Sequence, residues 1–181
     1  SIREMLGFCQ REEVGIAGAR LLYADDTIQH AGVVVGLGGV AAHVLCKLPR
    51  DAEGYMGRLR CVQEISAVTA ACMMVKTSVF KAVGGFDEEL KVAFNDIDLC
   101  MKVRKYGVKI VFTPYAELYH YESKSRGMED TPEKQLRFSR EVNCFRRKWE
   151  RELLKGDPYY NPNLTLNNTD CSLRKQEKNG D

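Results

Sequence analysis

Short apolar runs alternate with helical patterns along the 181 residues of the chain. This alternation restricts the possible folds more than any other feature of the sequence. Extended runs are expected at 14–23, 27–35, 40–45, 61–75, 108–112 and 117–121, and helices at 2–11, 76–83, 94–106 and from 131 onward. Strands that alternate with helices indicate an α/β domain, with a mixed sheet and flanking helices.

The last predicted helix carries a continuous apolar stripe, and Pro132 and Glu133 suit its first turn. The stripe consists of Phe138, Val142, Phe145, Trp149 and Leu153, at steps of four, three, four and four residues. Such spacing places all five side chains on one face of a helix. Beyond this helix the chain becomes polar and rich in Asn and Pro, so residues 1–155 are expected to form the domain and 156–181 an irregular tail.

Two carboxylates lie at the start of the helix predicted at 94–106. At about 100° per residue, Asp96 lies on the apolar face and Asp98 on the side of Lys102. We therefore expect Asp98 on a solvated face, in an i, i+4 ion pair with Lys102. Two roles stay open for Asp96. It suits the cap of a helix N-terminus; or, lining a cleft, it takes a proton from an incoming hydroxyl as a general base.

A second polar cluster follows the last predicted strand, where the segment 120–127 has the sequence HYESKSRG. His120 ends an extended run, and a neutral imidazole can bind a divalent metal. Ser123, Ser125 and Arg126 could hold phosphate oxygens through charge-assisted hydrogen bonds. A surface loop with solvated charges also explains these residues, so on the sequence alone both interpretations stay open.

Composition excludes several classes of protein. The formal net charge of +2 is too small to indicate nucleic-acid binding, and no apolar run reaches the roughly 18 residues that span a bilayer. Seven cysteines without a C-x-x-C pair argue against a zinc knuckle or a disulfide framework. They are expected to be reduced thiols of a cytoplasmic protein. His30 and His43 each stand alone among small residues and are expected to be structural.

Five motifs, in order, resemble those of the inverting family 2 glycosyltransferases, which have the GT-A fold. The segment 94–100 resembles the family's Glu-Asp segment, and Gly84-Gly85-Phe86-Asp87 is similar to its Gly-Gly-Phe-Asp. The segments 14–21 and 27–32 resemble the hairpin that follows the nucleotide-binding half. Segment 120–127 resembles a motif of bacterial O-antigen and rhamnan-type transferases, and 157–164 resembles their tail.

This resemblance implies roles for the residues that match. Asp96 would be the catalytic base. His120 would help to bind Mn²⁺ or Mg²⁺, and the loop residues Ser123, Ser125 and Arg126 would contact the donor diphosphate. The acceptor side would be shaped by Thr69, Ala71, Gly85, Phe86 and Asp87.

The sequence departs from the family in two respects. Asn95 stands where Glu is more usual, and neither the nucleotide-binding half nor an Asp-x-Asp metal motif is present. Asp96-Ile97-Asp98 has the spacing of that motif, but its carboxylates point apart on a helix. The chain is therefore expected to be the C-terminal, acceptor-side part of a longer enzyme, and to be inactive on its own.

The resemblance implies transfer of a sugar, with inversion, from a nucleotide-sugar donor to a saccharide or lipid-linked saccharide acceptor in polysaccharide synthesis. A non-catalytic carbohydrate-binding or assembly module is the main alternative, and a hydrolase using Asp96 and His120 is a weaker one. No nucleic-acid partner is expected. The basic long helix allows peripheral contact with the inner face of the plasma membrane, although a solvated helix face explains it as well. A truncated core could also self-associate as a homo-oligomer.

Overall fold

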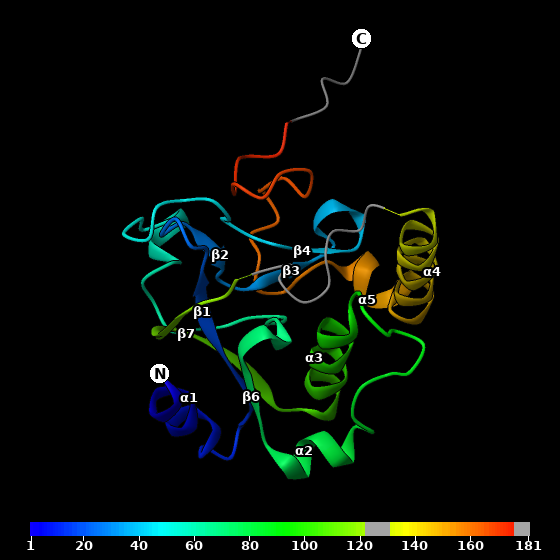
Figure 1. The fold of residues 1–181 in the computed structure, drawn as a ribbon, viewed down its shortest axis with the longest axis horizontal. Helices are drawn as coiled ribbons and strands as arrows, with labels where there is room; N and C mark the ends of the chain where they lie inside the picture. Colours follow the sequence, from blue (N-terminus) through cyan, green and yellow to red (C-terminus); the bar gives the residue numbers. More distant parts are fainter. Residues whose placement is uncertain (122–130, 176–181) are drawn as a thin grey trace.

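A computed structural model describes residues 1–121 and 131–175 of the chain. They form a mixed α/β fold, in which a curled mixed sheet is flanked by helices (Figure 1). The helices are α1 (Ile2–Cys9), α2 (Thr77–Ala82), α3 (Asn95–Tyr106), α4 (Pro132–Lys148) and α5 (Glu150–Lys155), with short 3₁₀ turns at Leu37–Gly39, Tyr55–Gly57 and Ala70–Cys72. The strands are β1 (Val14–Leu22), β2 (Ile28–His30), β3 (Val33–Val35), β4 (Ala41–His43), β5 (Gln63–Glu64), β6 (Met73–Val75) and β7 (Lys109–Tyr119).

Strand β1 is the centre of the main sheet. It pairs in parallel with β7 along one edge and antiparallel with β2 and β6 along the other. Strand β5 continues the sheet as the antiparallel neighbour of β7. The hairpin predicted between 14–23 and 27–35 is confirmed for β1 and β2. Its second arm breaks at Gly32, where φ is +103°, and β3 then pairs with β4 in a separate two-stranded sheet.

The expectation of two separate extended runs, at 108–112 and 117–121, is wrong, because β7 runs unbroken from Lys109 to Tyr119 through Pro114. Its pairing with β1 shifts at this point: Thr113 lies opposite Ala19, whereas Glu117 lies opposite the next residue of β1. Residues 114–116 therefore form a bulge. Proline has no N–H to give to a ladder, and a bulge is one of the few places where a sheet tolerates it.

The expectation of one buried strand over 61–75 is also wrong. The segment holds only the short strands β5 and β6, and its buried residues Ile65, Ala67 and Val68 lie between them. Val68 packs across the face of β1, where a Cβ on Gly18 would approach Val68 Cγ1 to 2.4 Å. The apolar character of this segment therefore reflects packing over the sheet and not pairing within it.

Two apolar clusters cover the two faces of the sheet. The smaller lies under α1 and includes Met5 and Cys9. The larger includes residues of α3 and α4, and it also takes in Tyr160 and Leu164 from the tail beyond α5. The described residues 156–175 form no helix or strand, yet this segment contributes to the core.

The long helix predicted from residue 131 is confirmed, but it is divided into α4 and α5 at Trp149. Thr131 caps α4, since its Oγ1 accepts a hydrogen bond of 3.3 Å from Lys134 N. The predicted apolar stripe is buried at its centre, at Phe145 and Trp149, whereas Phe138 near its beginning is 43% exposed. The middle of the helix therefore anchors it against the α3 side of the core.

Candidate functional site

Asp96 lies in the first turn of α3, half-buried, and both of its carboxylate oxygens accept backbone hydrogen bonds. Ala70 N donates to Oδ2 at 3.0 Å, and Ile97 N donates to Oδ1 at 2.9 Å. Two N–H donors from separate elements fix the plane of the carboxylate. Each oxygen has a second lone pair, so the group can still accept a hydrogen bond from another molecule.

The turn that leads into Asp96 is held from α4 by a residue that the sequence analysis did not single out. Glu141 is 3% exposed, and its carboxylate accepts hydrogen bonds from three successive backbone amides, Lys91 N at 3.2 Å, Val92 N at 3.3 Å and Ala93 N at 2.6 Å. Phe94 follows in the left-handed region, with φ of 62°. The signal was present in the helical stripe, because Glu141 lies between Phe138 and Phe145 at helical spacing.

The expectation that Asp98 lies on a solvated face is wrong, because its side chain is completely buried. Trp149 Nε1 donates a hydrogen bond of 2.8 Å to Asp98 Oδ1, and Lys148 Nζ lies 2.8 Å from the same oxygen. The predicted pair with Lys102 exists, at 3.2 Å from Oδ2. That ammonium also donates to Gly85 O, and its contact with Oδ2 is an ion pair without hydrogen-bond geometry. Asp98 thus joins α3 to the junction of α4 and α5.

The Gly85-Phe86-Asp87 turn is tied to the same group of charges. Lys148 bridges the carboxylates of Asp98 and Asp87, and its hydrogen bond is the largest cause that lowers the pKa of Asp87 below its usual range. Phe86 is 47% exposed and packs edge-on against Phe80, with ring centroids 5.6 Å apart. The turn therefore has a fixed backbone, while Phe86 presents an aromatic ring to solvent.

Thr69 and Ala71 lie in the segment that contacts Asp96 through Ala70. Thr69 Oγ1 accepts a hydrogen bond of 3.3 Å from Ala71 N, and Thr69 N donates to His30 Nε2 at 3.4 Å. His30, which was expected to stand alone, also pairs with His43 through their Nδ1 atoms at 2.8 Å.

The neighbours of His30 define its protonation. Because its Nε2 accepts from Thr69 N, the proton of the neutral ring lies on Nδ1, which donates to His43 Nδ1. Burial lowers the pKa of His30 well below its usual range, and the charge of His43 lowers it further. The structural role predicted for these two histidines is consistent with these contacts.

His120 lies just beyond β7, half-buried, and its backbone N–H donates to Leu22 O at 3.0 Å. Gln29 holds the ring: its Nε2 donates to His120 O at 3.0 Å, so its Oε1 faces His120 Nδ1 at 2.8 Å. The Nδ1 atom must then carry the proton, which leaves the Nε2 lone pair for a ligand. A metal-binding histidine commonly has such a partner on its other nitrogen.

The predicted donor-site residues Ser123, Ser125 and Arg126 lie outside the described residues. Among the residues that the structure describes, no group of three or more His, Cys, Asp or Glu side chains is arranged to hold a metal ion. The described part of the chain also has no helix long and apolar enough to cross a membrane. All seven cysteines are free thiols, as expected.

Asp96 and His120 are connected through adjacent residues of two short segments. His120 contacts Gln29 on β2, and the next residue, His30, contacts Thr69. The residue after Thr69 donates to Asp96. Three side-chain contacts and two peptide links therefore join the two groups that the sequence analysis selected.

No protein-family profile matches the chain. The chain is 55% identical over 173 residues to "Uncharacterized protein y4gI" of Sinorhizobium fredii, an alignment that covers 95% of this chain and 19% of that protein. It is 38% identical over 179 residues to "O-antigen biosynthesis protein RfbC" of Myxococcus xanthus, which covers 98% of this chain and 14% of that protein.

A shorter match is to an "N-acetylglucosaminyl-diphospho-decaprenol L-rhamnosyltransferase" of Mycobacterium tuberculosis. It is 36% identical over 62 residues, which is 34% of this chain and 20% of that protein. The chain thus spans a fifth or less of the length of these curated relatives. These similarities support a glycosyltransferase-like family.

Proposed function

We propose that the chain is the acceptor-side part of an inverting glycosyltransferase of family 2 with a GT-A fold. The whole protein would move a sugar from a nucleotide-sugar donor to a saccharide or lipid-linked saccharide acceptor during polysaccharide synthesis, at the cytoplasmic side of the membrane. The mixed sheet with flanking helices is compatible with this fold. The relatives named for O-antigen biosynthesis and for rhamnosyl transfer support the class of reaction.

The observation that carries the proposal is the position of the Asp96 carboxylate. It is half-buried at the start of α3, oriented by Ala70 N and Ile97 N, and still able to accept a proton. A general base must lie within hydrogen-bond reach of the proton that it removes. A carboxylate fixed by the backbone and open on one side meets this need.

In the proposed reaction, Asp96 removes the proton of the acceptor hydroxyl as its oxygen bonds to the anomeric carbon of the donor sugar. The bond from that carbon to the diphosphate breaks on the opposite side, which inverts the configuration. The nucleoside diphosphate leaves with the bonding electrons. Glu141 keeps the backbone before Asp96 in place during this step, through its hydrogen bonds to residues 91–93.

His120 fits the metal-binding role assigned to it, because Gln29 occupies its Nδ1 and leaves the Nε2 lone pair for a ligand. A bound Mn²⁺ or Mg²⁺ would neutralise the negative charge of the departing diphosphate. His120 would supply one ligand, with the others from outside the described residues. Ser123, Ser125 and Arg126 would hold diphosphate oxygens, and Thr69, Ala71 and the Gly85-Phe86-Asp87 turn would form the acceptor side.

The test is Asp96→Asn in the full-length protein that contains this segment. We expect sugar transfer to a saccharide acceptor to fall by roughly 10²- to 10⁴-fold, the usual contribution of a general base, while the circular dichroism spectrum stays unchanged. Glu88→Gln is the matched control, since Glu88 is an exposed carboxylate nearby. Turnover by Asp96→Asn within a few-fold of the wild type would exclude the base role, and absence of transfer by the wild type would favour the non-catalytic module.

A further inference from the structure

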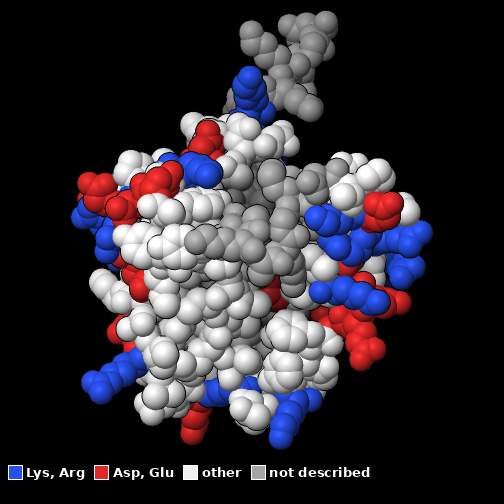
Figure 2. All heavy atoms as spheres, in the orientation of Figure 1, with Lys and Arg blue, Asp and Glu red and all other residues white. Residues whose placement is uncertain are grey.

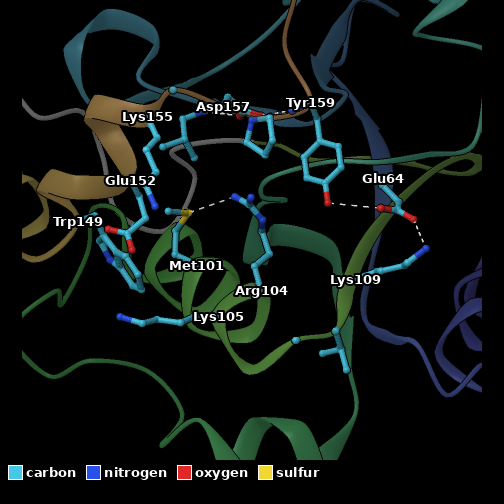
Figure 3. A pocket seen from close by; sticks show the side chains of 15 residues that line it. Glu64, Met101, Arg104, Lys105, Lys109, Trp149, Glu152, Lys155, Asp157 and Tyr159 are labelled. Carbon is cyan, nitrogen blue, oxygen red and sulfur yellow. Dashed lines mark hydrogen bonds and ion pairs between the residues drawn. The ribbon is translucent and has the colours of Figure 1, made fainter.

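A pocket of about 570 Å³ lies between the C-terminal half of α3 and the segment that follows α5 (Figure 3). Arg104 and Lys105 line it from α3, Glu152 and Lys155 from α5, and Tyr159 from the tail. None of the residues assigned to sugar transfer above lines this pocket. Its volume lies within the range of small-molecule sites, about 300 to 1,000 Å³.

Several polar groups at this pocket have hydrogen-bonding capacity that the protein does not use. Within residues 1–121 and 131–175, the side chains of Glu152, Lys105 and Lys155 make no hydrogen bond or ion pair. Arg104 is anchored by the hydrogen bond of 3.0 Å from its Nη1 to Ser66 Oγ, and its guanidinium lies 5.3 Å from the centre of the Tyr159 ring. Figure 3 shows Arg104 and Tyr159 extending into the pocket from opposite walls.

The charges around the pocket are nearly balanced. Four cationic side chains face three carboxylates: Arg104, Lys105, Lys109 and Lys155 against Glu64, Glu152 and Asp157. Lys109 pairs with Glu64, and Asp157 accepts hydrogen bonds of 2.8 Å from the backbone N–H groups of Val35 and Tyr159. A phosphate site would need donors only. Here an unpaired carboxylate, Glu152, lies beside the unpaired donors.

This combination suits hydroxyl groups, because each hydroxyl both donates and accepts a hydrogen bond. A sugar ring presents several hydroxyls at its edge and apolar C–H groups on its faces. The aromatic ring of Tyr159 and the neighbouring side chains Met101, Val108 and Pro158 provide apolar surface for such a face.

We propose that this pocket is a saccharide-binding subsite for an uncharged sugar unit, separate from the Asp96 segment. Arg104 and Asp96 are eight positions apart on α3, about 12 Å along the helix axis, so a sugar in the pocket does not occupy the position of the reacting hydroxyl. The choice of a saccharide rests in part on the proposed function, in which the pocket would hold a more distant unit of the growing chain. Binding at the pocket does not itself require Asp96.

The only tryptophan of the chain provides a direct readout. Trp149 lines the pocket and is the single Trp of the sequence, so its fluorescence reports on occupancy. We would titrate the 181-residue chain with L-rhamnose, N-acetyl-D-glucosamine, D-galactose and D-mannose, and with inorganic pyrophosphate as the anionic probe. Backbone NMR shifts of Arg104, Lys105 and Tyr159 provide a second, independent location of the ligand.

Four variants separate the explanations. Glu152→Ala and Lys155→Ala remove unpaired groups of the pocket, while Arg151→Ala changes an exposed residue of the same helix that does not line it. Asp96→Asn removes the proposed base. We expect saturable binding of at least one sugar, weakened about fivefold or more by Glu152→Ala or Lys155→Ala, and unchanged in Arg151→Ala.

The remaining outcomes contradict the inference. These are no saturable response to any of the four sugars, a response that survives both pocket substitutions, and tighter binding of pyrophosphate than of every sugar. If sugar binds as expected but Asp96→Asn retains full transfer activity in the full-length protein, the subsite stands and the proposed base is wrong. If instead Asp96→Asn abolishes transfer but no sugar binds in the pocket, the base role stands and the subsite is wrong.

Discussion

Glu141 on α4 receives a hydrogen bond of 2.6 Å at Oε2 from the backbone N–H of Ala93, three residues before Asp96. The same carboxylate accepts the N–H groups of the two preceding residues. A segment without regular structure, joining the Gly-Gly-Phe-Asp turn to α3, is thus held by one side chain about fifty positions further along. The position of the proposed base depends on a helix that itself supplies no group to the chemistry.

The first prediction concerns this contact. Glu141→Gln replaces one oxygen by an NH₂ group that faces backbone donors, so at least one of the three N–H groups loses its acceptor. An unsatisfied donor costs about 1–3 kcal/mol when buried; these contacts are part-buried, so we expect a decrease of about 1 kcal/mol in the free energy of unfolding measured with urea. Arg140→Gln, at an exposed position in the interior of the same helix, is the control. Equal stability of Glu141→Gln and the wild type would show that the clamp contributes nothing.

The second prediction separates the two aspartates of α3. Asp98 is buried against Trp149, Lys148 and Lys102, and removal of one member of a buried charged group typically costs about 3–5 kcal/mol. Asp98→Ala should therefore lower the unfolding free energy by several times more than Asp96→Ala, which removes a half-buried side chain. Chemical denaturation of both variants checks this, and a smaller loss for Asp98→Ala than for Asp96→Ala would contradict the network.

These aspartates show what a single sequence can and cannot reveal. The spacing within 94–106 correctly predicts a helix, and Asp96 and Asp98 do contact different partners, but the solvated face that the angle per residue assigns to Asp98 is wrong. That angle does not predict that Asp98 is buried, because Trp149 and Lys148 come from about fifty positions away. Those two residues were interpreted as part of an apolar stripe and a solvated basic face, and neither pattern specifies a partner.

The basic helix face illustrates the same limit. Figure 2 shows Lys and Arg side chains on the α4 side of the molecule, with Asp and Glu side chains among them. Lys148, a basic residue of the last turn of α4, bridges Asp87 and Asp98, and Arg146 donates to Gly39 O at 3.1 Å. Such pairing is tertiary and cannot be deduced from a list of charges. Peripheral membrane contact through this helix stays a prediction.

Strand predictions failed where apolar character and pairing differ. Residues 65–68 have the composition of a buried strand, yet they pack across β1 at Gly18. Conversely, Pro114 would ordinarily end a strand, but the parallel ladder between β1 and β7 resumes beyond it. Both errors arise because composition reports burial, whereas the partner that completes the hydrogen bonds lies far away in the sequence.

The third prediction concerns pH. Burial and the charge of His43 lower the pKa of His30 in the folded chain, whereas in the unfolded chain it titrates near 6.5. Between these two values the unfolded state binds more protons, so the free energy of unfolding decreases as the pH falls below about 6.5, by up to about 1.4 kcal/mol per pH unit for one proton.

Thermal denaturation between pH 8 and pH 5 should therefore show a melting temperature that falls at the acid end. Titration of the His30 Cε1 proton by NMR provides the direct check, since this proton should keep the chemical shift of a neutral imidazole at pH 6. A normal titration of His30 near pH 6.5 in the folded protein would contradict the assignment of a neutral, buried ring.

The last prediction concerns His120 and the glutamine that orients it. If His120 binds the metal through Nε2, His120→Ala in the full-length protein should raise the Mn²⁺ concentration needed for half-maximal transfer, and calorimetry should show weaker Mn²⁺ binding. Gln29→Leu keeps the imidazole but removes the Oε1 acceptor of Nδ1 and the donor to His120 O. Loss of such an outer partner commonly weakens metal affinity about 10- to 100-fold, so Gln29→Leu should reproduce the defect in Mn²⁺ binding with His120 still present.

Because Gln29 is 4% exposed, its variant is compared with the wild type by chemical denaturation, and only the Mn²⁺ affinity of folded protein counts. Unchanged Mn²⁺ affinity in His120→Ala would exclude the imidazole as a ligand, and a defect in His120→Ala without one in Gln29→Leu would show that the ring does not depend on Gln29 for its orientation.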